Sequence, residues 1–240
     1  MTCPNKMPSK SRFLVAPAAL LLAAVMGTSA LAQVAPPAAN TAPDGAATDQ
    51  SAPANPGPPI TGFRSAQFGM TEAQVKDVIE KDFHLPASAI QAGENAIQHT
   101  DVLNVSVPNL MPNGGTANVA YVFGYQSHKL IAVNVLWSKV TDPKITPEQI
   151  YQNGESLQQY FASEGFPPQR STGNVGLPSG ILLFRASDTS GNVVLLVLSG
   201  NLIKDPKNQD KTALTPATLS LAYAADPEHA DVYHLNKGSF

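Results

Sequence analysis

The sequence has almost no cysteine: among its 240 residues only Cys3 carries a thiol. That residue lies in an N-terminal segment that we expect to be removed from the mature chain. A mature chain without cysteine forms no disulfide, even in an oxidising compartment. Thiol nucleophiles, C-x-x-C redox motifs and thiolate metal sites are excluded for the same reason.

Motifs for serine hydrolysis and nucleotide binding are also missing. No Gly-x-Ser-x-Gly turn occurs, and no Lys-Ser/Thr pair follows the glycines at Gly173, Gly176 and Gly180. We interpret these glycines as loop residues. The sequence therefore predicts no catalytic residue and no cofactor.

Metal-ligating residue types gather at one place, near the C-terminus. Glu228, His229, Asp231 and His234 lie within seven residues. Imidazole and carboxylate groups together can hold a divalent ion such as zinc. However, Pro227 precedes them and the histidines lack the i, i+4 spacing of a helical pair, so we favour a solvated polar tail and predict no metal site.

Basic residues are few and scattered. The chain has 15 Lys and Arg against 18 Asp and Glu, a formal charge of −3, and loss of the three basic residues before residue 33 would leave −6. A nucleic-acid partner is not expected, because no basic stripe could neutralise phosphates. No basic helix with an apolar face is present to bind anionic lipid.

The chain does begin with the pattern of an export signal. Lys6, Lys10 and Arg12 precede an apolar run of 14 residues from 13 to 26, and Ala30–Ala32 reads A-x-A. This order is typical of a cleavable signal peptide, and the run is shorter than the ~20 residues that a membrane span needs. We predict cleavage of residues 1–32, no membrane span in the mature chain, and a periplasmic or secreted protein that begins at Gln33.

The segment that follows differs sharply in composition from the rest. Residues 33–61 are rich in Ala and Pro and contain no aromatic side chain. Such a segment buries too little apolar surface to offset the entropy of ordering, so we predict a disordered linker. The remaining residues, 62–240, are predicted to form a single domain.

Two helix starts are marked by the same local motif. Thr71 is followed three residues later by Gln74, and Thr146 by Gln149, which is the pattern of a capping box. Apolar residues then recur at helical spacing after each motif. Gly165 predicts the end of the second helix.

Strands are predicted after each helix, at residues 102–107, 119–123, 130–137, 181–185, 193–198 and 218–223. The order of one helix and about three strands occurs twice, in halves 62–140 and 141–225. This order predicts an α+β fold in which an antiparallel sheet carries helices on one face. Tandem duplication is one interpretation of the repeat; capping boxes that arose independently are the other, because such boxes begin many helices.

The segment Phe68–Val75 carries a resemblance to known families. An aromatic-Gly-Met-Thr start that leads into an amphipathic helix and a hairpin is similar to small bacterial envelope proteins. These include the β-lactamase-inhibitor-protein fold and small outer-membrane assembly lipoproteins. The lipidated cysteine of those lipoproteins is absent here, so membrane attachment does not carry over. The resemblance implies a role in binding or assembly.

Four aromatic residues cluster on the first predicted hairpin: Tyr121, Phe123, Tyr125 and Trp137. The period of two places the first three on one face of the sheet. They form either the core beneath the first helix or an exposed binding surface, since Tyr and Trp are enriched in binding hot spots. Their exposure decides between the two interpretations.

Together these patterns predict a non-catalytic binding or assembly module of the cell envelope, with another envelope protein as its partner. The alternative is a site that forms only in the fold, in a small hydrolase that uses His229 or His234 or in a protein that binds a small ligand or metal. A deep pocket with polar groups around those histidines would favour the alternative.

Overall fold

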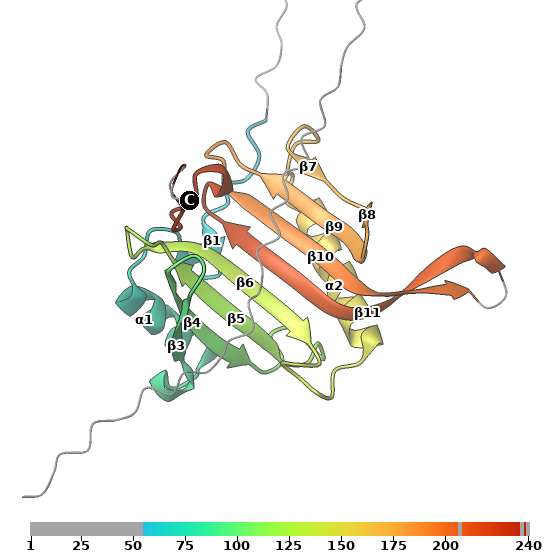
Figure 1. Cartoon of the computed structure of the whole chain (residues 1–240), viewed down its shortest axis with the longest axis horizontal. Helices are drawn as coiled ribbons and strands as arrows, with labels where there is room; N and C mark the ends of the chain where they lie inside the picture. Colours follow the sequence, from blue (N-terminus) through green and yellow to red (C-terminus); the bar gives the residue numbers. More distant parts are fainter. Residues whose placement is uncertain (1–54, 206–207, 236–237, 239–240) are drawn as a thin grey trace, which may run out of the picture. The chain divides into compact units, whose positions relative to one another are not determined.

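The computed structural model of the chain describes residues 55–205, 208–235 and 238 (Figure 1). The predicted signal peptide and most of the predicted linker lie outside the described residues. In chain order the elements are β1 (Gly62–Phe63), β2 (Ala66–Gln67), α1 (Glu72–Phe83), η1 (Ala87–Ala89), β3 (Gln91–Asn95), β4 (Thr100–Val107), β5 (Ala117–Phe123), β6 (Leu130–Ser138), α2 (Pro147–Ser163), β7 (Ser171–Thr172), β8 (Val175–Leu177), β9 (Gly180–Ser187), β10 (Val193–Asp205), β11 (Asn208–Ala224) and η2 (Pro227–His229).

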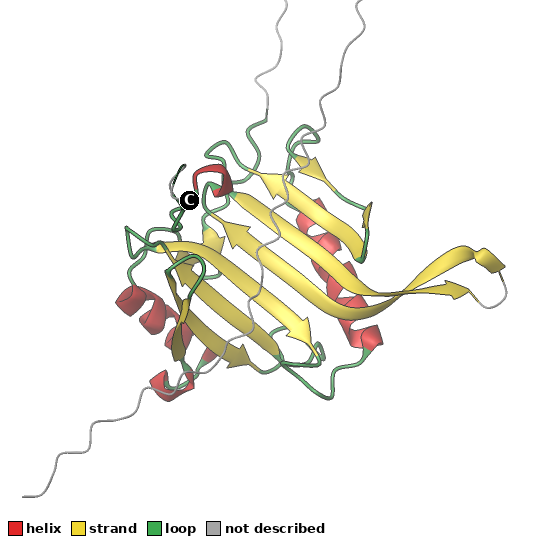
Figure 2. Cartoon of the chain, viewed as in Figure 1, coloured by secondary structure: helices red, strands yellow, loops and turns green. Residues whose placement is uncertain are grey.

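The fold is a large antiparallel sheet with both α-helices on the same face, as the sequence predicts (Figure 2). The nine strands run in the order β3-β4-β5-β6-β11-β10-β9-β7, and β8 also pairs with β9. The short strands β1 and β2 form a separate two-stranded ladder. Short strands β3, β7 and β8 at the margins were not predicted, since two to five polar or glycine-containing residues give no periodic signal.

Both helices begin at the predicted capping boxes. The hydroxyl of Thr71 accepts a hydrogen bond from the Gln74 backbone (3.3 Å), and the Gln74 side chain accepts one from the Thr71 backbone (2.9 Å). Thr146 and Gln149 make the same pair of bonds, at 3.2 Å and 3.0 Å. Each box satisfies two backbone groups that a helix start otherwise leaves unpaired, so both starts are determined locally.

The two halves of the sequence meet in the middle of the sheet. The first half contributes β3 to β6, the second contributes β7 to β11, and β6 pairs with β11. Val135 lies opposite Leu221 and Trp137 opposite Leu219 across this seam. The halves therefore share one sheet and one core, while their origin by duplication stays a prediction.

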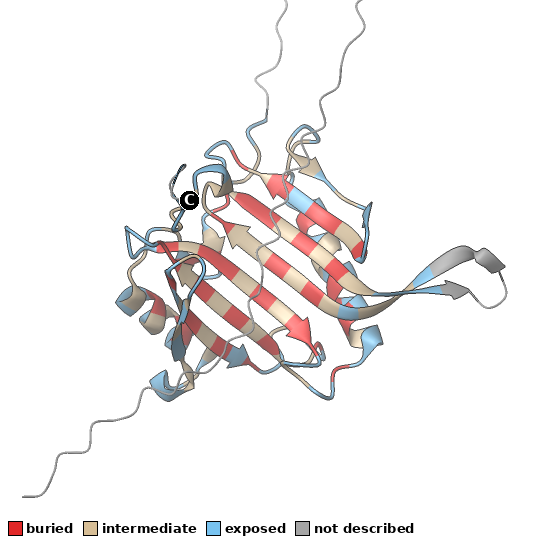
Figure 3. Cartoon of the chain, in the orientation of Figure 1, coloured by how far each residue is buried: buried red, intermediate tan, exposed pale blue. Residues whose placement is uncertain are grey.

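The core lies between the sheet and the helices (Figure 3). Val75 and Ile79 of α1 and Ile150 and Phe161 of α2 are buried against alternate residues of the central strands. Burying each such side chain contributes about 1.5–3 kcal/mol. The two-residue period along the strands fixes which side chains enter this layer.

The strands β10 and β11 run beyond their neighbours as a two-stranded arm (Figure 1). Their pairing continues from Gly200 opposite Pro216 to Asp205 opposite Asn208. The sequence predicted strands that end at residue 198 and begin at 218. The arm was missed because Leu202 and Ile203 are both exposed, so burial imposes no alternation there.

The folded part of the chain is anchored at its N-terminal end by the turn between β9 and β10. Ile60 is buried, and its backbone N–H donates to the Asp188 carboxylate at 2.9 Å. The Asn192 side chain donates to the Ile60 carbonyl at 2.9 Å. These two hydrogen bonds fix the residues just before Gly62 to the β9–β10 turn.

Candidate binding surface

Three of the four aromatic residues singled out in the sequence belong to the core. Tyr121, Phe123 and Trp137 are 0%, 1% and 1% exposed, and only Tyr125 reaches the surface, at 38%. The core interpretation is right for those three, and the binding-surface interpretation fails for them. They occupy strand positions that face the helices, where apolar area is removed from water.

Tyr125 belongs to a small aromatic cluster that joins three distant segments. Its ring centroid lies 6.0 Å from that of His99 and 5.6 Å from that of Tyr233, and His99 and Tyr233 are 4.7 Å apart. His99 follows β3, Tyr125 follows β5, and Tyr233 lies in the C-terminal tail. The cluster packs the tail against the ends of two hairpins.

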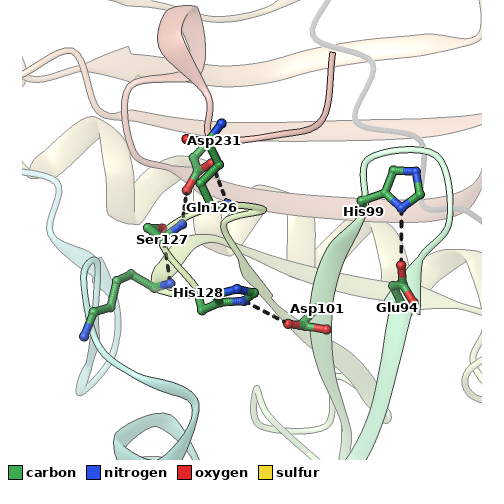
Figure 4. Close-up of polar contacts among 8 residues, drawn as sticks. Glu94, His99, Asp101, Gln126, Ser127, His128 and Asp231 are labelled. Carbon is green, nitrogen blue, oxygen red and sulfur yellow. Dashed lines mark hydrogen bonds and ion pairs between the residues drawn. The ribbon is translucent and has the colours of Figure 1, made fainter. Parts of the chain in front are cut away.

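Asp231 fastens the same tail to the turn between β5 and β6 (Figure 4). Its carboxylate accepts backbone N–H groups of Gln126 (3.0 Å) and Ser127 (2.9 Å), and its carbonyl accepts that of Tyr125 (2.9 Å). Partial burial opposes ionisation of Asp231, but the hydrogen bonds from Ser127 and Gln126 outweigh it and lower the pKa of this carboxyl. A Cβ at Gly124 would collide with the Asp231 carboxylate, so a larger residue there would displace this contact.

Three histidines lie beside carboxylates on this end of the molecule. The Nδ1–carboxylate oxygen distances are 3.5 Å for His99–Glu94, 3.3 Å for His128–Asp101 and 2.9 Å for His229–Asp226 (the first two pairs are drawn in Figure 4). All six side chains are largely exposed. Exposed pairs of this kind contribute about 0–1 kcal/mol each, because water screens them.

The polar residues near the C-terminus point to different neighbours. Asp231 binds the β5–β6 turn, His229 contacts Asp226, and Glu228 and His234 are exposed. Within the ranges that the structure describes, no three His, Asp or Glu side chains converge closely enough to hold a metal ion.

The surface has two shallow hollows, one on the helix side of the molecule and one at the base of the arm. The first has a volume of about 310 Å³ and its lining includes Phe161, Phe166 and Phe184. The second, of about 230 Å³, is lined in part by Lys139 and Pro147. Neither hollow has a histidine in its lining, so neither provides the pocket that a hydrolase using His229 or His234 would need.

No described α-helix packs on the face of the sheet opposite α1 and α2 (Figure 2). Six adjoining strands, β4, β5, β6, β11, β10 and β9, have side chains that point away from the helices. The pairing register places these outward side chains in three rows across the sheet. We call these eighteen residues the open face. They are Val102, Val122, Ala132, Ala224, Val193 and Ser187; Asn104, Ala120, Asn134, Ala222, Leu195 and Arg185; and Ser106, Asn118, Leu136, Ser220, Val197 and Leu182.

The composition of the open face is unusual for a sheet surface. It holds four valines, four alanines, three leucines, three serines, three asparagines and a single arginine, Arg185, on β9 near one margin. Most of these side chains are half-buried by their neighbours. The face therefore carries one charge, is mostly apolar and is free of aromatic rings.

The open face was not predicted from the sequence, because the predicted binding surface rested on large aromatic residues and this face has none. A signal was present: in 117–123 and 130–138 the positions between the buried residues are Asn, Ala, Val, Ile and Leu rather than charged residues. Only the sheet order shows that six such strands adjoin one another.

A comparison of the chain with protein-family models, with curated proteins and with solved structures gives no match. The resemblance of residues 68–75 to small envelope proteins thus stays a prediction. No helix among the described residues has both the length and the apolar character to cross a membrane.

Proposed function

We propose that the protein is an exported, non-catalytic module of the cell envelope that binds a protein partner through the open face. The composition of that face carries the proposal. Antiparallel sheets that face water normally place polar and charged side chains on the outer side. The centres of protein–protein interfaces are instead depleted of charge, and the open face has a single charge, near its margin.

The remaining features support the same proposal. The signal-peptide pattern of residues 1–32 directs the chain across a membrane. The histidines that pair with carboxylates, His99, His128 and His229, are exposed and lie outside both hollows. Catalysis usually needs such groups in a site that excludes water.

Photo-crosslinking in intact cells tests the proposed surface. A photoreactive amino acid replaces Leu136, which lies on the open face, and in a matched variant it replaces Tyr160, which is exposed on α2 in the opposite layer. We expect a covalent protein adduct from position 136 alone. No adduct at 136, or identical adducts from both positions, would contradict the proposal.

Export is tested separately by sequencing the N-terminus of the protein recovered from the envelope and the medium. We expect it to begin at Gln33. A chain that keeps Met1 or Thr2 and remains in the cytoplasm would rule out the export part of the proposal.

A further inference from the structure

We infer that the partner on the open face is a second copy of the same chain, so that two sheets stack face to face about a two-fold axis. This inference rests on the proposed function and names the partner. Three properties of the face carry it: its area, its polar groups and its side-chain sizes.

The area matches what a dimer needs. Six strands in three rows of outward residues cover roughly 600 Å² per copy, from the spacings of ~4.8 Å between strands and ~6.8 Å between outward residues. Two copies would bury about 1,200 Å², the lower end of the range for specific interfaces.

The polar groups on the face are complementary to themselves. Apart from Arg185, they are the amides of Asn104, Asn118 and Asn134 and the hydroxyls of serines. Amides and hydroxyls both donate and accept hydrogen bonds, so these groups can pair with groups of the same kind on a second copy across a two-fold axis. A partner with an acidic or basic surface would find no opposite charge at the centre of this face.

Side-chain size permits the stacking. Packed sheets lie about 10 Å apart, a spacing at which large side chains of one sheet need small residues opposite them on the other. The central row has Ala120, Asn134 and Ala222 on three neighbouring strands. These residues leave room for the leucines and valines of the other rows of a second copy, since interdigitated large and small residues fill such a layer.

Sedimentation equilibrium of the protein purified after export from cells that express the full-length chain measures the association. We expect a monomer–dimer equilibrium in the wild type. Asn134→Asp puts a charge of the same sign on each copy near the two-fold axis and should weaken the dimer at least tenfold. Asn109→Asp, in an exposed turn at positive φ that Asp tolerates, is the matched control and should leave association unchanged.

A charge-swap mixture makes the test specific for a second copy. Asn134→Asp and Asn134→Lys should each be mainly monomeric, and mixing them should restore dimers that contain one of each. Ser220→Asp and Ser220→Lys, on β11 of the same face, give a second pair if either Asn134 variant fails to fold. A monomeric wild type, or a dimer that the Asp variants do not weaken, would overturn the inference.

The sedimentation and crosslinking results together distinguish this inference from the proposed function. If the wild type is monomeric but position 136 still crosslinks to a different protein in cells, the face binds another partner and only the second copy is excluded. If the wild type is monomeric and position 136 gives no adduct, both the inference and the proposed function fail.

Discussion

At the scale of single residues, burial decides what the aromatic side chains do. The hydroxyl of Tyr121 is buried without a hydrogen-bond partner among the described residues, although its ring fills the core under α1. An unpaired buried hydroxyl costs about 1–3 kcal/mol, which the ring burial has to offset. A phenylalanine at position 121 would supply the same ring without the hydroxyl.

Tyr121 therefore offers a matched pair of substitutions. Tyr121→Phe keeps the ring and removes the unpaired group, so stability should be unchanged or rise by up to ~1 kcal/mol. Tyr121→Ala leaves a cavity and should cost about 3–5 kcal/mol. Urea unfolding measures both, and a large loss in Tyr121→Phe would show that the hydroxyl has a partner after all.

Alkaline pH should destabilise the fold through two tyrosines. Burial raises the pKa of Tyr121 and, together with the nearby Tyr160 and Glu164, that of Tyr223. A raised folded-state pKa gives stability that is complete below the unfolded value near 10 and is lost as pH rises above it. Urea midpoints from pH 8 to 11 should fall above pH ~10, and Tyr223→Phe should flatten this decline. An unaltered slope in the variant would contradict the prediction.

At the scale of elements, local motifs place the helices and tertiary contacts place the tail. The capping boxes act within four residues, whereas Asp231 reaches backbone groups more than a hundred residues earlier in the chain. The two kinds of contact should respond differently to mutation.

Loss of the second cap should weaken the whole fold by a modest amount. Thr146→Ala removes the hydroxyl that accepts the Gln149 N–H and should cost about 1 kcal/mol. Thr146→Ser keeps the acceptor and is the control. Thermal unfolding distinguishes them, and equal losses in both variants would mean that the methyl group, rather than the cap, matters.

Loss of the Asp231 carboxylate should release the tail and leave the rest folded. In Asp231→Ala the amides of Gln126 and Ser127 lose their acceptor, so their hydrogen exchange should accelerate. Because the pKa of Asp231 is lowered, the wild-type contact should persist through mild acid and be lost only below pH ~4, as the carboxylate is protonated. Unchanged exchange in the variant would show that the aromatic cluster alone holds the tail.

At the scale of the whole molecule, the β6–β11 seam joins the two halves in one sheet and one core. Trp137 of the first half packs at the seam opposite Leu219 of the second. A core shared in this way should unfold in one step.

The single tryptophan allows a direct check. Trp137 fluorescence reports the seam between the halves, and far-UV circular dichroism reports the sheet and helices of both halves. The two urea transitions should coincide, in the wild type and in Leu219→Ala, which should lose about 2–5 kcal/mol. Separate transitions would show that the halves fold independently.

The local elements of this protein could be predicted from the sequence because their causes are local. Thr71 with Gln74 and Thr146 with Gln149 set the helix starts within one turn. Alternating apolar residues marked the central strands β4, β5, β6, β9, β10 and β11, and the repeated order of elements indicated the α+β class. The predicted export signal is likewise a pattern of consecutive residues.

What only the tertiary structure decided is how those elements are placed beside one another. Residues with the same two-residue period can face a helix or water, and no local rule separates Tyr121 in the core from Tyr125 at the surface. The open face exists because β6 pairs with β11, which sets outward residues from both halves in shared rows. Pairing between distant strands depends on the free energy of the whole core, so no single segment of the sequence predicts which strands pair.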